Sequence, residues 1–202
     1  DPSWMKRAAK LLNKKECTES DIFFSISESL YNIDPSSAAA ANMGIRALKR
    51  KDYKKAVDFY TYALDNEPDT INKAQYAYRL AQTYGAMNNN KSAKTYALKA
   101  ANFRSGWGEP YILIGDLYAK TSRQCGELKT EFLKRVGYWA AIDKYEYAKK
   151  VDHLTSLKAT KRIEKYTEQM PSKTDVFTEG LIGVPKYQID CWYSETVNIR
   201  IQ

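Results

Sequence analysis

The stretch from Ala40 to Ala63 decides the fold. It carries the pattern Ala40-x2-Met43-Gly44-x2-Ala47, followed by Ala56-x3-Tyr60-x2-Ala63 and then by Pro68. Residues three and four apart share one face of a helix, so each half predicts a helix with a buried small-residue face. Gly44 lets a second helix approach closely, Tyr60 fills the space beside it, and Pro68 ends the second helix. The stretch therefore predicts a closely packed helix pair.

The same pattern recurs twice downstream, as Ala77-x2-Leu80-Ala81-x2-Tyr84 with Ala93-x3-Ala97-x2-Ala100, and as Tyr111-x2-Ile114-Gly115-x2-Tyr118 with Ala141-x3-Tyr145-x2-Ala148. The small residues Gly44, Ala81 and Gly115 are 37 and 34 residues apart. Self-similarity at such a period is typical of stacked helical repeats. The sequence predicts an all-α helical-hairpin solenoid.

The repeats and their interruptions predict a division of the chain. The expected parts are a degenerate helix pair at 1–36, three repeats at 37–153 (37–70, 71–107 and 108–153), a capping helix at 154–173 and a C-terminal extension at 174–202. Ala93 and Ala141 lie 48 residues apart, 14 more than 34 (48 minus 34), which indicates an insert at 121–137 with a helical stretch from Glu127 to Arg135. In the extension, apolar and polar residues alternate over Tyr187–Tyr193 and Thr196–Ile201. This alternation predicts a short β-hairpin with Ser194 and Glu195 between its strands.

Charge narrows the class of partner. The chain has 32 Lys and Arg against 24 Asp and Glu, a net charge of +8, but acidic residues are interleaved with the basic ones, as on solvated helix faces. We therefore disfavour nucleic acid as the ligand. A basic surface that binds nucleic acid or an anionic lipid or glycan is the alternative to a protein-binding module. No apolar run is long enough to cross a membrane.

The reactive residues do not form a catalytic or metal-binding constellation. His153 is the single histidine, and Cys17, Cys125 and Cys191 form no C-x-x-C pair. We therefore expect no metal, no cofactor and no enzymatic activity. Cys17 and Cys125 lie in polar contexts and Cys191 in an apolar run. Two alternatives stay open: a Cys17–Cys125 disulfide in an exported protein, or three reduced thiols.

Residues 37–153 resemble the tetratricopeptide repeat (TPR), a helix–turn–helix unit that stacks into a right-handed superhelix. In that family the first helices line a concave groove for partner proteins. Carried onto this chain, the resemblance implies a groove lined by Arg46, Gln75, Tyr78, Arg79, Gln82, Glu109 and Asp116. The Lys and Asn with which some members hold a C-terminal carboxylate are replaced by Ala41 and Ile45, which disfavours a chaperone-tail receptor.

Two further motifs, Gln124-Cys125-Gly126 before Tyr138–Lys144 and Cys191-Trp192-Tyr193-Ser194-Glu195-Thr196, resemble exported TPR proteins of Bacteroidetes. This resemblance implies a periplasmic or outer-membrane-associated adaptor whose signal segment is absent from this chain, and a protein partner that could belong to a membrane-protein complex. A cytoplasmic location is the alternative. An enzyme or carbohydrate-binding protein with its site in the insert at 121–137 is a third, weaker reading.

Overall fold

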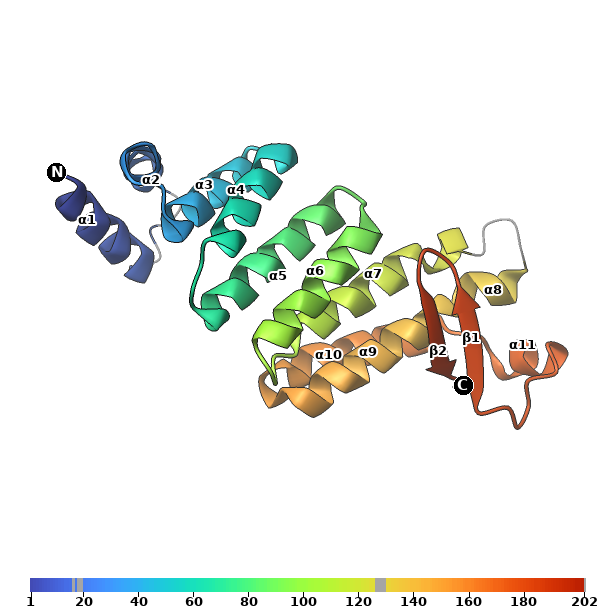
Figure 1. Ribbon diagram of the computed structural model, residues 1–202. Coiled ribbons are helices and arrows are strands. Elements are labelled where there is room, and N and C mark those ends of the chain that lie inside the picture. The colour runs from blue at the N-terminus through green and yellow to red at the C-terminus, as the bar shows by residue number, and fades with distance from the viewer. Residues whose placement is uncertain (16, 18–19, 126–129, 202) are drawn as a thin grey trace. The chain divides into compact units, whose positions relative to one another are not determined.

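The computed structural model describes residues 1–15, 17, 20–125 and 130–201. It divides the chain into two compact units, residues 1–89 and 90–202, which we call unit 1 and unit 2. The boundary falls between α5 and α6, within the second predicted repeat. Figure 1 shows that helices dominate both units and that two short strands follow near the C-terminus.

Unit 1 consists of α1 (Pro2–Lys14), α2 (Asp21–Ile33), α3 (Ser37–Lys49), α4 (Tyr53–Asp65) and α5 (Thr70–Ala86). Polar residues at the N-caps fix where helices begin. The side chains of Ser36, Asp52 and Asp69 accept hydrogen bonds from the backbone N–H groups of Ala39, Lys55 and Asn72. Only a short turn separates the end of α3 at Lys49 from the start of α4 at Tyr53, and the two helices pack against each other.

The core of unit 1 depends on one close helix–helix approach. A Cβ at Gly44 of α3 would lie 2.8 Å from Cζ of Tyr60 on α4, so only glycine leaves room for this ring. Tyr60 is 1% exposed, and its partners Ala56 and Ala63 are fully buried. The pair predicted from the sequence is therefore packed as expected. A second cluster, built around Phe23 and including Ala9, Phe24, Ile26, Leu30 and Ala39, joins α1 and α2 to α3.

Unit 2 repeats this packing with additions. It contains α6 (Asn90–Phe103), α7 (Glu109–Cys125), α8 (Glu131–Arg135), α9 (Gly137–Val151), the short 3-10 helix η1 (His153–Thr155), α10 (Ser156–Thr167) and α11 (Lys173–Thr178). A Cβ at Gly115 of α7 would meet the buried Tyr145 ring of α9. Helix α10 lies against α9 (Figure 1) and has a single buried residue, Ala159, as expected of a polar capping helix.

The insert differs from the prediction. Residues 127–129 of the predicted helical stretch lie outside the described residues, and α8 covers only Glu131–Arg135. Thr130 caps α8, and Val136 separates it from α9. Gly137 packs so closely on Ser122 of α7 that a Cβ there would lie 2.6 Å from the serine oxygen. Val136 has helical backbone angles (φ −59°, ψ −27°), so α8 and α9 follow one another with this one residue between them.

The C-terminal hairpin is present with a different turn. Strands β1 (Lys186–Asp190) and β2 (Ser194–Asn198) pair antiparallel, with Tyr187 opposite Val197. The turn is Cys191–Tyr193, so the prediction that Ser194 and Glu195 form it is wrong. The side chains of Trp192 and Tyr193 pack on the Tyr118 ring of α7, and both residues lie in the turn and not in β1. The predicted all-α helical-hairpin fold with a C-terminal β-hairpin is confirmed. No helix within the described residues is long and apolar enough to span a membrane.

Candidate functional site

A groove in unit 1 is lined mainly by the first helix of each pair. It encloses about 620 Å³ and takes Lys6, Ala9, Lys10 and Asn13 from α1, Ala38, Ala39, Ala41, Asn42 and Ile45 from α3, Asn72, Gln75 and Tyr76 from α5, with Leu30 and Ser36 beside them. We call this cleft the amide groove. The small side chains of the alanines leave this space open. Amide side chains can both donate hydrogen bonds to a peptide backbone and accept them from it.

A buried carboxylate organises one wall of the amide groove. Glu67, 8% exposed, accepts hydrogen bonds from Ser37 Oγ at 2.7 Å and from the Asp69 backbone N–H at 3.2 Å, and a longer one from Asn72 Nδ2 at 3.4 Å. Burial, followed by the charge and hydrogen bond of Glu67, raises the pKa of Tyr76 to about 12. Tyr76 is therefore a neutral phenol at physiological pH, and the start of α5 is held against the start of α3.

The structure brings only some of the predicted groove residues together. Gln75 lines the amide groove. Tyr78, Arg79 and Gln82 follow it at spacings of three, four and seven residues on the same face of α5, and Arg79 donates to Gln82 at 3.2 Å. Arg46, in contrast, lines a different pocket of unit 1.

The predicted groove residues of unit 2, Glu109 and Asp116, are engaged by α10. Lys158 donates to Glu109 at 2.5 Å, and Arg162 forms two hydrogen bonds with Asp116 at 2.6 and 3.0 Å. Tyr145 also donates to Asp116 at 2.8 Å. These two carboxylates therefore anchor the capping helix in this structure.

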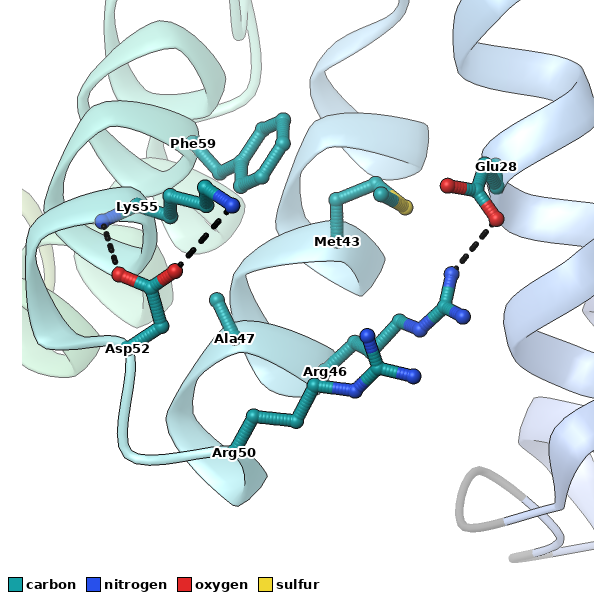
Figure 2. Close-up of a pocket in the computed structure, with 8 residues that line it drawn as sticks. All are labelled: Glu28, Met43, Arg46, Ala47, Arg50, Asp52, Lys55 and Phe59. Carbon is teal, nitrogen blue, oxygen red and sulfur yellow. Dashed lines mark hydrogen bonds and ion pairs between the residues drawn. The ribbon is translucent and has the colours of Figure 1, made fainter.

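The pocket that contains Arg46 lies between α2, α3 and α4 and encloses about 390 Å³. Its lining, drawn in Figure 2, is Glu28, Met43, Arg46, Ala47, Arg50, Asp52, Lys55 and Phe59. We call it the arginine pocket. Arg46 donates to Glu28 at 2.7 Å, and Lys55 pairs with Asp52 at 3.3 Å. The amide groove and the arginine pocket share no lining residue.

In unit 2, the hairpin is bound to the helices by a carboxylate that sequence reasoning missed. Glu195 of β2 accepts hydrogen bonds from Tyr118 Oη at 2.6 Å, Lys94 Nζ at 2.9 Å and Lys144 Nζ at 3.0 Å. The Tyr193 ring stacks on Tyr118 with centroids 3.9 Å apart. Glu195 does occur in the motif that carries the resemblance to exported proteins, and this was the signal available.

The disulfide also differs from the predicted one. Cys125, the last residue of α7, is bonded to Cys191 in the hairpin turn, with Cα atoms 5.4 Å apart, and Cys17 is an exposed free thiol. The Cys17–Cys125 bridge is therefore wrong. The sequence places Cys191 in an apolar run with strand-like alternation, but β1 ends at Asp190, and this leaves Cys191 in an exposed turn within reach of Cys125.

The comparisons with known proteins support the fold. The crystal structure of MamA protein matches with a TM-score of 0.59 at 14% sequence identity, covering 89% of this chain and 83% of that chain. This likeness shows a TPR-like helical fold. No family model matches the sequence, and no curated protein matches it either. Within the described residues, no group of three or more His, Cys, Asp or Glu side chains could hold a metal ion.

Proposed function

We propose that this chain is a non-enzymatic protein-interaction module, in which the amide groove binds an extended segment of a partner polypeptide. The observation that carries the proposal is the composition of the groove. Three first helices, α1, α3 and α5, supply amide side chains, α1 adds two lysines, and alanines of α1 and α3 complete the lining. An extended peptide exposes unpaired backbone N–H and C=O groups, which amide side chains satisfy without demanding one sequence.

The charged and apolar residues of the amide groove indicate which part of a partner chain it would bind. Lys6 is paired with Asp34 at 2.6 Å, whereas no hydrogen bond or ion pair joins Lys10 to another described residue. Ala41 and Ile45 line the groove where a carboxylate clamp would need charged or amide groups. The proposed ligand is therefore an internal peptide segment and not a chain terminus. We include Tyr78, Arg79 and Gln82 as an extension of this surface along α5.

The test selects peptides from a displayed random library on the full chain and measures their affinity for groove variants. We expect Lys10→Ala, Asn42→Ala and Gln75→Ala each to weaken binding by about two- to tenfold, because distributed contacts contribute about 0.5–1.5 kcal/mol each. Lys161→Ala, which removes an exposed lysine of α10 that lines neither pocket, is the matched control. Peptides whose affinity is the same for all four variants would exclude the amide groove as their site.

We further propose that the protein is exported to the cell envelope, where a membrane-protein complex is one class of partner. The Cys125–Cys191 disulfide and the Bacteroidetes resemblance support this location, since disulfides persist in oxidising compartments. Acid quenching of source cells followed by alkylation with a heavy maleimide tests it. Modification at Cys17 alone is expected. Modification of all three thiols would favour the cytoplasmic alternative.

A further inference from the structure

The arginine pocket combines positive charge with an apolar surface. Arg46 and Arg50 extend from the α3 end of the pocket toward the helix that carries Glu28, Met43 extends from α3 in the same direction, and Phe59 projects from α4 (Figure 2). Ala47 adds to the apolar part of the lining. A ligand that fits both parts needs an anionic group close to an apolar one.

Arg46 is held in position before any ligand binds. Its Nη1 donates to Glu28, and its guanidinium lies 5.8 Å from the centroid of the Phe24 ring, which is 6% exposed. A guanidinium has five N–H donors, so the pairing with Glu28 leaves donors for a second carboxylate. This side chain therefore offers a preorganised charged contact.

Arg50 is a lining cation whose charge has no partner among the described residues. It is exposed, it follows the last residue of α3, and no hydrogen bond or ion pair joins its side chain to any residue that the structure describes. Lys55 at the rim is 71% exposed and pairs only with the neighbouring Asp52. The basic residues 49–51, 54 and 55 are close in sequence to the lining residues, and their positive charge would attract an acidic segment before contact.

We propose that the arginine pocket is a second docking site, which binds a short acidic segment of a partner protein in which Asp or Glu stands beside an apolar residue. The carboxylate lies between Arg46 and Arg50, and the adjacent apolar side chain packs on Met43, Ala47 and Phe59. Charge-assisted hydrogen bonds supply the orientation, and burial of the apolar side chain adds affinity. The site is independent of the amide groove, because no residue lines both.

The lining favours a protein segment over nucleic acid. Glu28 and Asp52 also face the pocket and would repel a continuous phosphate backbone, whereas a peptide can place one carboxylate away from them. The apolar side of the pocket has no counterpart in a free inorganic anion. A peptide with neighbouring acidic and apolar side chains satisfies both features.

The experiment uses the full chain and a pool of fluorescent hexapeptides, each with Asp or Glu next to Phe, Leu or Met in a Gly-Ser background. Binding measured by fluorescence polarisation should weaken about tenfold in Arg50→Ala, because the loss removes a charge-assisted hydrogen bond. Arg7→Ala, which removes an exposed arginine of α1 outside both sites, is the matched control and should bind as the parent does. Pools with Asn or Gln in place of the acids, or Ser in place of the apolar residue, should bind weakly.

Three results would overturn the proposal. The first is no binding by any pool member up to about 1 mM, and the second is equal peptide affinities for Arg50→Ala and Arg7→Ala. The third is peptide binding that weakens in Lys10→Ala and Asn42→Ala but not in Arg50→Ala. A single-stranded oligonucleotide that binds in an Arg50-dependent manner, while the peptides do not, would assign the pocket to nucleic acid. Failure here leaves the amide groove intact, since its variants are different and its peptides are selected separately.

Discussion

The contact between Gly44 and Tyr60 carries the packing logic of the array at the level of single residues. In each unit a glycine of one helix lies against a tyrosine ring of another: Gly44 of α3 against Tyr60 of α4, and Gly115 of α7 against Tyr145 of α9. A smaller residue in one helix thus accompanies a larger one in its partner. The missing Cβ of each glycine leaves the space that the tyrosine ring fills, as close packing requires.

Gly44→Ala should therefore destabilise unit 1, although alanine is the better helix former. The new Cβ would lie 2.8 Å from the Tyr60 ring, and overpacking of this kind costs about 1–3 kcal/mol. Denaturant titration of the single variant, of Tyr60→Ala and of the double variant measures the coupling. In the double variant the new Cβ no longer meets a ring, so its free energy of unfolding should exceed the value expected from adding the two single losses.

The carboxylate of Glu195 should make the stability depend on acid. Burial by itself raises its pKa, but hydrogen bonds from Tyr118, Lys94 and Lys144 outweigh burial and lower the pKa from 4.5 to about 2. Because the folded pKa is below the unfolded one, the contribution to stability is complete above about pH 4.5 and is lost as the pH falls toward 2.

Glu195→Gln tests this contribution by removing the charge and keeping the shape. We expect a loss of about 1–3 kcal/mol at neutral pH and a shallower fall of the melting temperature between pH 5 and pH 2, because two lysines lose their common partner. Glu164→Gln, on the exposed side of α10, is the control and should follow the parent. A Glu195→Gln profile parallel to that of the parent would show that Glu195 titrates normally.

As an element, the hairpin depends on its attachments to the helices of unit 2, of which Glu195 is one. Asn198 donates to Asp143 of α9 through its backbone at 3.1 Å and its side chain at 3.0 Å, Arg200 pairs with Asp143 at 2.6 Å, and the disulfide holds the turn. A two-stranded hairpin alone is marginal in water. These attachments therefore decide whether β1 and β2 stay formed.

Cys191→Ser should lower stability by roughly 2–4 kcal/mol, because the disulfide closes a loop spanning 66 residues and restricts the unfolded chain. Hydrogen exchange should rise first in β1 and β2 and leave α9 protected. Cys17→Ser removes an exposed free thiol and should change neither quantity. Equal melting temperatures for the two serine variants would mean that the helix contacts alone hold the hairpin.

At the scale of the whole molecule, the division at residues 89 and 90 predicts separable responses to damage. Tyr60→Ala and Tyr145→Ala each remove a fully packed ring from equivalent positions in different units, at a cost of about 3–5 kcal/mol. Repeat arrays transmit such losses mainly to nearest neighbours. Hydrogen exchange should increase over α1–α5 in the first variant and over α6–α10 in the second. Uniform loss of protection in both would indicate one cooperative unit.

The candidate sites were predicted less fully than the fold. Gln75, which the repeat resemblance places on the groove side, lines the amide groove, because its place in the repeat determines the face of α5 on which it lies; its role in binding stays a prediction. The position of the Arg46 side chain does not follow from the sequence, because a long side chain at the edge of a helix face can turn to either neighbouring helix. In the structure it turns to α2, where it donates to Glu28. Lys10, Asn13 and Asn42 were missed because the sequence offered no small-residue pattern in α1 and no reason to weight single amides.

The sequence by itself determined the helix pairs, because small and large residues at helical spacing leave only one way to bury both faces. It also determined the hairpin, since alternation of apolar and polar residues suits a strand and not a helix. The tertiary structure decided the disulfide partner, the turn at Cys191–Tyr193 and the binding of Glu195. These depend on side chains more than 50 residues apart in the chain, as the separation of 66 between Cys125 and Cys191 illustrates. No local pattern encodes such a distance, because it is set by how the intervening helices pack.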